Sequence, residues 1–94
     1  MHAAIRRYQT SDIQELSRRV QEEFVPTVRN VPGFIAYYVV DGGGGEVASI
    51  TVCEDSAGVD ESTRRAAAWV GEELSHLITG GPDVIAGEVV ARSA

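Results

Sequence analysis

Five side chains with chemical capability fall along one flank of a predicted helix: Ser62, Arg65, Trp69, Glu73 and His76. They follow one another at three- and four-residue spacing beside an apolar stripe. Tryptophan offers a flat wall with one hydrogen-bond donor, histidine moves a proton near neutral pH, and arginine holds an anionic oxygen. Trp69, His76 and Arg65 are therefore candidate catalytic residues. Each also has a purely structural explanation: Trp69 as packing, His76 with Glu73 as a surface pair, and Arg65 as a solvated charge.

Further candidates lie on predicted strands. Tyr37 and Tyr38 are consecutive, so they point to opposite faces of their strand. Arg6 and Arg7 are consecutive in the first strand, and Glu88 interrupts an apolar run in the last. Because these two strands are expected to be neighbours, Glu88 should pair with one of the arginines, as a structural ion pair or at the rim of a pocket. All five residues are pocket candidates.

Metal and phosphate chemistry find little support. His2 and His76 are the only histidines and Cys53 is the only cysteine, so no two ligands have metal spacing. Cys53 lies in a predicted strand and is expected to be a buried structural thiol. The glycines at 42–45 lead into a strand, which predicts a hairpin turn instead of a phosphate loop. We expect neither a metal nor a cofactor.

Length and charge narrow the function further. A chain of 94 residues predicts one domain spanning 1–94. The net charge of −6 argues against a nucleic-acid partner and against an anionic membrane surface. No apolar run approaches the roughly 18 residues of a membrane span. We therefore expect a soluble cytoplasmic protein.

The periodicity predicts the element order strand, helix, strand, strand, helix, strand. The strands are expected at 2–8, 34–40, 46–54 and 84–91. Ser11 and Gln14 form a capping box for the first helix, which Pro26 should kink or restart. Ser56 or Asp60 should cap the second helix, and the Gly-Gly-Pro at 80–82 should end it.

Both faces of the central hairpin are apolar. Alternation predicts one face with Phe34, Ala36, Tyr38 and Val40, and another with Ile35, Tyr37 and Val39. A sheet that is apolar on both sides needs cover on both. We therefore expect helices on one face and a second copy of the chain on the other, as a homodimer. The polar spots of the hairpin, Ser49 and Thr51 with the two tyrosines, would form the floor of a pocket.

Right-handed crossovers assemble this element order into a ferredoxin-like βαββαβ sandwich of class α+β, a four-stranded antiparallel sheet with two helices on one face. The sequence then resembles the dimeric α+β barrel superfamily, and within it the antibiotic-biosynthesis-monooxygenase-like proteins. The motifs that carry the resemblance are VPGF-x-x-YY at 31–38, VCED at 52–55, RRAAAWV at 64–70 and GEVVA at 87–91.

The resemblance implies a homodimer with a pocket in each subunit between sheet and helices. Two functions are compatible with it: cofactor-independent oxidation of an aromatic or quinol-like metabolite, and binding of a small apolar or aromatic ligand without turnover. The oxidising members use Asn, Trp, Tyr and Arg; Trp69, one of the two tyrosines and Arg6 or Arg7 supply three of these types. The haem-degrading members use Asn, Trp and His; Trp69 and His76 match two, and the first strand lacks the Asn.

Overall fold

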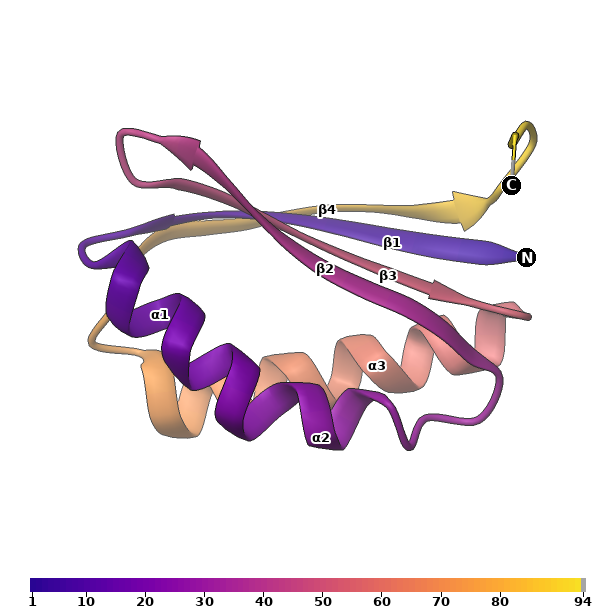
Figure 1. Ribbon diagram of the computed structural model, residues 1–94, viewed down its shortest axis with the longest axis horizontal. Helices are drawn as coiled ribbons and strands as arrows, with labels where there is room; N and C mark the ends of the chain where they lie inside the picture. Colours follow the sequence, from indigo (N-terminus) through magenta and orange to yellow (C-terminus); the bar gives the residue numbers. More distant parts are fainter. Residues whose placement is uncertain (94) are drawn as a thin grey trace.

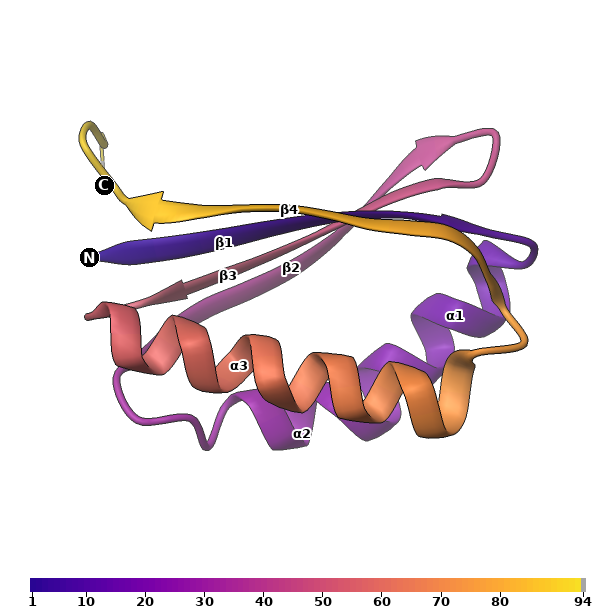
Figure 2. The same ribbon diagram turned by 180° about the vertical axis from the view of Figure 1, so that it is seen from behind.

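The computed structural model describes residues 1–93 and confirms the ferredoxin-like α+β fold. Its strands are β1 (His2–Thr10), β2 (Phe34–Gly43), β3 (Glu46–Cys53) and β4 (Ile78–Glu88). The first helical segment comprises α1 (Ile13–Arg19), the π-helical turn η1 (Val20–Phe24) and α2 (Val25–Val28). The second comprises α3 (Ser56–Trp69) and the π-helical turn η2 (Val70–Leu74). The strands pair antiparallel in the order β2-β3-β1-β4, and both helical segments cover the same face (Figures 1 and 2).

An aspartate caps the start of each of the two helical segments. Asp12 accepts a hydrogen bond from the backbone N–H of Glu15 at 3.1 Å, and Asp55 accepts one from Gly58 at 3.1 Å. These side chains satisfy backbone donors that the first helical turn leaves free. The predicted capping box at Ser11 and the predicted caps at Ser56 or Asp60 are therefore wrong by one residue or more.

The core forms where the helical stripes meet the inner face of the sheet. The first helical segment buries Leu16, Val20, Phe24 and Val28, which recur at the three- and four-residue spacing of one helix face. The second buries Val59, Ser62, Ala66 and Leu74, whereas Ala67 is exposed. Leu77 is buried in the turn that follows.

A bulge in β2 changes which side chains face the helices. The pairing with β3 shifts between Phe34 and Ala36. An extra residue in one strand reverses the alternation beyond it. Phe34 therefore packs on the core together with Tyr37 and Val39, although alternation placed it on the other face. The prediction is also wrong for Ile35, which is 46% exposed and not part of the core, whereas Tyr37 and Val39 face the core and Tyr38 is exposed, as predicted.

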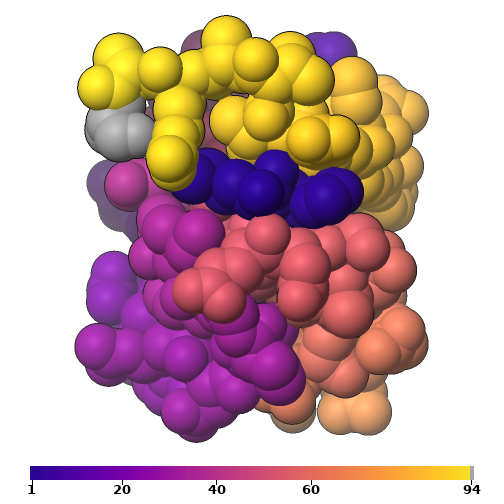
Figure 3. Space-filling view, turned by 90° about the vertical axis from the view of Figure 1, so that its right-hand side faces the viewer, coloured from indigo at the N-terminus to yellow at the C-terminus, as the bar shows by residue number. Residues whose placement is uncertain are grey.

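The last strand begins earlier than predicted. The helix ends at Leu74, and the Gly-Gly-Pro at 80–82 lies inside β4, where the pairing with β1 is irregular. A side chain at Gly81 is excluded, because its Cβ would lie 2.6 Å from the carbonyl oxygen of Arg7 and its φ is +94°. A proline is tolerated because β4 is an edge strand. β4 ends at Glu88, and the N–H of Val89 then donates to the carbonyl of Met1, so the C-terminal segment lies beside the N-terminus (Figure 3).

No helix of residues 1–93 covers the face of the sheet away from the two helical segments (Figure 1). The register aligns one row across all four strands: Tyr38, Ile50, Ile5 and Ile85. Tyr38 is 57% exposed and Ile85 is 69% exposed. Separately, no helix within residues 1–93 is both long and apolar enough to cross a bilayer.

Candidate functional site

A small, partly open cavity lies between the inner face of the sheet and the two helical segments. Its lining includes the aromatic residues Tyr8, Phe24, Tyr37 and Trp69, the polar residue Ser49, and aliphatic residues from both layers. Its volume is about 30 Å³, which is room for roughly two water molecules. A wider groove of about 290 Å³ between α1 and β2 shares Tyr37 with this wall. The cavity is therefore too small for a ligand of aromatic size unless it widens.

Three aromatic rings pack against one another in the cavity wall. Phe24, on η1, lies 5.3 Å from Trp69 between ring centroids, with an interplanar angle of 31°. On its other side Phe24 lies 5.5 Å from Tyr37, at 59°. Tilted pairs at these separations add to the stability gained from burial alone. The three rings hold the cavity wall in a defined shape.

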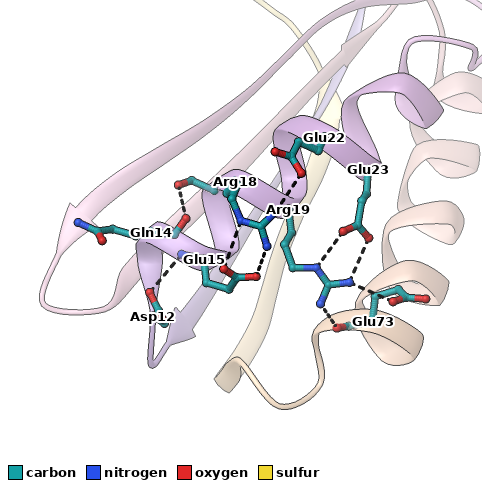
Figure 4. A network of polar contacts seen from close by, with 9 residues as sticks. Asp12, Gln14, Glu15, Arg18, Arg19, Glu22, Glu23 and Glu73 are labelled. Carbon is teal, nitrogen blue, oxygen red and sulfur yellow. Dashed lines mark hydrogen bonds and ion pairs between the residues drawn. The ribbon is translucent and has the colours of Figure 1, made fainter.

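A chain of polar contacts fixes Trp69 from the outside of this wall. Its side chain lies near the carboxylate of Glu23, which accepts from Arg19 Nε at 2.9 Å. Arg19 in turn donates to the carbonyl and carboxylate of Glu73, at 2.8 and 3.0 Å (Figure 4). The hydrogen bond from Arg19, with smaller help from Trp69, lowers the pKa of Glu23. Arg19 therefore connects η1 to η2 beside the cavity.

Arg6 is the most unusual charge in the molecule, because it is 2% exposed and its hydrogen-bond partners are all hydroxyls. Nη1 donates to Ser49 Oγ at 3.4 Å and to Thr51 Oγ1 at 3.2 Å. Nη2 donates to Ser62 Oγ at 3.1 Å and to Thr63 Oγ1 at 2.9 Å. Among residues 1–93, its buried Nε has no hydrogen-bond partner. Burial lowers the pKa of this guanidinium.

Two tyrosine hydroxyls share this corner of the cavity. Burial raises the pKa of Tyr37 to about 12, although Arg6 and a hydrogen bond with Ser49 act in the opposite direction. Burial likewise raises the pKa of Tyr8, again opposed by Arg6. Both hydroxyls are therefore neutral donors and acceptors near pH 7. The cavity thus combines an apolar aromatic wall with one polar corner at Ser49, Tyr8 and Tyr37, and Arg6 lies behind that corner.

Comparison with solved structures gives matches that span nearly the whole chain, among them the following three. A protein of unknown function from Nitrosomonas europaea is 18% identical, with TM-score 0.79 over 99% of this chain and 92% of that one. A monooxygenase from Streptomyces coelicolor, in complex with nanaomycin D, is 20% identical, with TM-score 0.73 over 99% and 88%. The haem-degrader MhuD from Mycobacterium tuberculosis, with two haems in its active site, is 20% identical, with TM-score 0.75 over 100% of both chains.

The chain has the antibiotic-biosynthesis-monooxygenase fold. The resemblance stated from the sequence is thereby confirmed for the fold. No protein-family model matches the sequence, and no curated protein matches it.

Within this fold, the structure brings together only some of the predicted site residues. Trp69 and Tyr37 line the cavity, and Arg6 lies directly behind it. Tyr38 lies on the opposite face of the sheet. Arg7 is exposed and pairs with Glu46 at 3.4 Å, away from the cavity.

Two of the three catalytic candidates lie outside the cavity wall. Arg65 donates to the carbonyl of Thr27 at 3.2 Å, so it joins α3 to α2, and its guanidinium also approaches Glu61 at 3.7 Å. His76 is exposed in the turn after η2. The turn begins after Leu74, and this early helix end takes His76 off the flank that carries Trp69.

The expected pairing of Glu88 with an arginine of β1 is wrong. In the register between β1 and β4, Glu88 lies opposite His2, whereas Arg6 lies opposite Val84 and Arg7 opposite Asp83. The early start of β4 causes this difference. β4 begins at Ile78 instead of the predicted residue 84, so the middle of the strand, and not its end, lies opposite Arg6 and Arg7.

Two residues, one in the polar corner and one beside Arg6 behind it, were given no site role from the sequence. Tyr8 shares a face of β1 with Ala4 and Arg6, and that shared face was visible in the alternation. Ser62, which holds Arg6 from the helix side, was placed on the flank beside Trp69 without a role. Within residues 1–93, no cluster of three or more His, Cys, Asp and Glu side chains is arranged to hold a metal ion.

Proposed function

We propose that this protein binds a small aromatic or quinol-like metabolite between its sheet and helices and oxidises it with molecular oxygen, without a cofactor. The single observation that carries the proposal is the aromatic wall of Phe24, Tyr37 and Trp69 around a cavity with one polar corner. Flat apolar walls with a few converging polar groups are the usual form of a small-molecule site. The fold, which the chain shares with a monooxygenase from Streptomyces coelicolor, supports the same proposal.

In this reaction the substrate supplies the reactive electrons. Its enolate or phenolate form transfers electrons to oxygen. One oxygen atom enters the substrate carbon as a carbonyl, and the other leaves as water with two hydrogens from the substrate. In an anthrone both hydrogens come from the reacting carbon; in a naphthol one comes from that carbon and one from the hydroxyl. The protein holds the ring against Trp69, excludes water and stabilises the anionic oxygen at the polar corner. The neutral hydroxyls of Tyr8 and Tyr37 are hydrogen-bond donors for that oxygen.

The functional unit in this proposal is a homodimer. The uncovered row of Tyr38, Ile50, Ile5 and Ile85 spans every strand of the sheet, so a second copy related by a twofold axis would meet it with the same row. Contiguous apolar surface of this kind is unusual on a monomer. The cavity lies on the other side of the sheet, and both copies would keep their own site.

Ligand binding without turnover is the second candidate function. The observation that favours it is that the cavity wall holds no group that titrates near neutral pH: Tyr8 and Tyr37 have raised pKa values, and His76 lies outside. A protein of this kind would carry or sense an apolar ligand. Mass spectrometry of the purified protein would then find a bound small molecule that stays chemically unchanged in air.

Haem does not fit the described site. The one candidate for an axial histidine in the helical region, His76, is exposed and outside the cavity wall, and the cavity of about 30 Å³ is far smaller than a porphyrin. Titration with haemin should therefore give no Soret shift that depends on His76.

Oxygen uptake tests the oxidation directly. We expect the protein to accelerate oxygen consumption by anthrone- or naphthol-like substrates, and Trp69→Phe and Tyr37→Phe to slow it. The substitution Glu72→Gln, at an exposed position of η2, is the control. Consumption no faster than in buffer, or consumption unaffected by both aromatic substitutions, would exclude the oxidation in this cavity.

A further inference from the structure

We propose that the polar corner of the cavity selects a ligand with an acidic hydroxyl and binds that hydroxyl as its anion, a phenolate or an enolate. The corner consists of Ser49, Tyr8 and Tyr37, with the Arg6 guanidinium behind it. The inference rests on the proposed function for the presence of a ligand in this cavity. It adds that the ligand is already an anion when it binds, before any reaction with oxygen, and names Arg6 as the residue that determines this charge state.

Among residues 1–93, the positive charge of Arg6 is buried without a negatively charged partner. Its hydrogen bonds go to Ser49, Thr51, Ser62 and Thr63, which are all neutral. The acidic groups that act on it electrostatically are Tyr8, Tyr37 and Cys53, one from each of three strands. Burial raises the pKa of all three groups above its ordinary value, so they are neutral near pH 7.

A buried ion normally lies beside an opposite charge, because moving an ion out of water without a counter-charge costs free energy. The hydroxyl partners accept hydrogen bonds from Nη1 and Nη2 of Arg6, but they carry no negative charge to offset its positive charge. An anion in the cavity would offset that charge in a region of low dielectric constant, where the attraction is stronger than in water.

Ser49 connects Arg6 to the cavity. Its oxygen accepts from Arg6 Nη1, so its hydrogen remains free to be donated. The separation of 3.4 Å is the longest of the four bonds to Arg6, so this contact is the least demanding to rearrange. Ser49 lines the cavity beside Tyr37. The Ser49 hydroxyl can therefore donate a hydrogen bond to a ligand oxygen. Arg6 lies behind Ser49 and acts as a positioning residue.

The buried Nε of Arg6 points to the same conclusion. It is one N–H for which residues 1–93 provide no acceptor. Buried donors in native proteins nearly always have a partner in the protein, in ordered water or in a ligand. The arginine thus has both charge and hydrogen-bonding capacity beyond what its own chain uses.

A matched pair of probes tests the proposal: 4-nitrophenol, which ionises, and 4-nitroanisole, its neutral methyl ether. Trp69 is the only tryptophan and lines the cavity, so quenching of its fluorescence reports binding of either probe. Above the pKa of the free phenol, we expect at least about tenfold tighter binding of 4-nitrophenol. The absorbance of the bound phenol should show its pKa lowered by roughly one to three units, the usual effect of a nearby opposite charge.

Arginine variants then assign the effect. Arg6→Gln should abolish the preference for the phenolate and the pKa shift. Arg64→Gln removes the same charge from an exposed position, where Arg64 pairs only with Glu61, and should retain both. If Arg6→Gln does not fold, Ser49→Ala takes its place and should reduce the preference. The pH titration of 4-nitrophenol bound to the unaltered protein needs no variant.

Equal affinity for the two probes, or a preference that survives in Arg6→Gln, would overturn the anion site and leave the cavity as a neutral aromatic site. Failure of both probes to quench Trp69 at millimolar concentration would overturn the site together with the proposed function. Phenolate selectivity without oxygen uptake would uphold the site and exclude the oxidation. The two proposals can therefore fail separately.

Discussion

The rings of Phe24 and Trp69 lie 5.3 Å apart, and each belongs to a π-helical turn or to the residue just before one. Phe24 is the last residue of η1, and Trp69 directly precedes η2. A π-helical turn widens the helix locally and changes the direction of the side chains that follow, and such turns are frequent at functional sites. Here both turns flank the same cavity. The aromatic pair is the contact through which the two helical segments close over the sheet.

Phe24→Ala should destabilise the fold strongly. Phe24 is 1% exposed and contacts both Trp69 and Tyr37, so its removal leaves a void next to an existing cavity. We expect the free energy of unfolding to fall by about 3–5 kcal/mol. Urea denaturation followed by circular dichroism measures it. Val90→Ala, at a side chain that is 91% exposed, should change it by less than about 0.5 kcal/mol. A loss below about 1 kcal/mol for Phe24→Ala would contradict the aromatic core.

Trp69→Phe should weaken ligand binding more than it weakens the fold. A phenyl ring retains part of the contact with Phe24 but loses part of the flat wall. We expect about tenfold lower affinity for 4-nitrophenol, measured by equilibrium dialysis because this variant has no tryptophan. His76→Ala should leave the affinity unchanged, since the imidazole is exposed outside the cavity wall. Equal effects of the two substitutions would contradict this location of the site.

The architecture was predictable because periodicity and crossover rules act over whole elements. The predictions failed where a local backbone irregularity changes which side chains face the core or where an element begins. The bulge after Phe34 moved that ring to the helix face, and Gly81 kept the chain in β4 where a helix stop was expected. The second difference also displaced Glu88 from Arg6. No local pattern signals either event.

The site was predictable in part. Trp69 and Tyr37 are large and lie on apolar flanks, so composition alone selects them. The choice between Arg6 and Arg7 depends on which face of β1 meets the helices, and alternation gives two sets without saying which is inside. Tyr8 follows Arg6 once that face is known. A buried arginine with only hydroxyl partners has no sequence signature, because its partners lie 43 to 57 residues away.

The outer face of the sheet should hold a dimer together. We expect light scattering to give a mass of about twice the 10.0 kDa of one chain. Ile5 lies in the centre of the apolar row, between Ile50 and Ile85, so Ile5→Lys should shift the mass towards one chain because it places charges in the interface. Ala68→Lys, at an exposed position of α3, adds the same charge elsewhere and should keep the dimer. A mass of one chain for the unaltered protein at micromolar concentration would remove the basis for the dimer.

Stability should fall steeply in alkali because of Tyr37. Its pKa rises from 10.0 in the unfolded chain to about 12 in the fold, so the unfolded state loses its proton first as the pH increases. The stabilisation is complete below pH 10 and is lost between pH 10 and about 12, a decrease of roughly 2–3 kcal/mol. Tyr8 acts in the same direction. Urea midpoints at rising pH should show this decrease diminished in Tyr37→Phe and retained in Tyr38→Phe, whose hydroxyl is on the exposed face. Identical pH profiles for the two variants would contradict the burial of the Tyr37 hydroxyl.

Arg19 should control access to the cavity, and its neighbour Arg18 provides the control. Both arginines pair with glutamates, but the partners of Arg18, Glu15 and Glu22, belong to its own helical segment, whereas Arg19 also reaches Glu73 on η2 (Figure 4). The side chain of Arg19 is 16% exposed and that of Arg18 is 53% exposed. Exposed pairs within one helix contribute little, and a pair that joins two segments resists their separation.

The cavity of about 30 Å³ must widen before an aromatic ligand enters, and the widening separates η1 from η2. Arg19→Gln should therefore lower the urea midpoint more than Arg18→Gln does, and it alone should speed the association of 4-nitrophenol several-fold in stopped-flow quenching of Trp69. Combining Arg19→Gln with Glu73→Gln should add nothing further to the rate, because both substitutions break the same contact. Equal rates in the two arginine variants would show that the ligand enters without parting the helices, through the groove between α1 and β2.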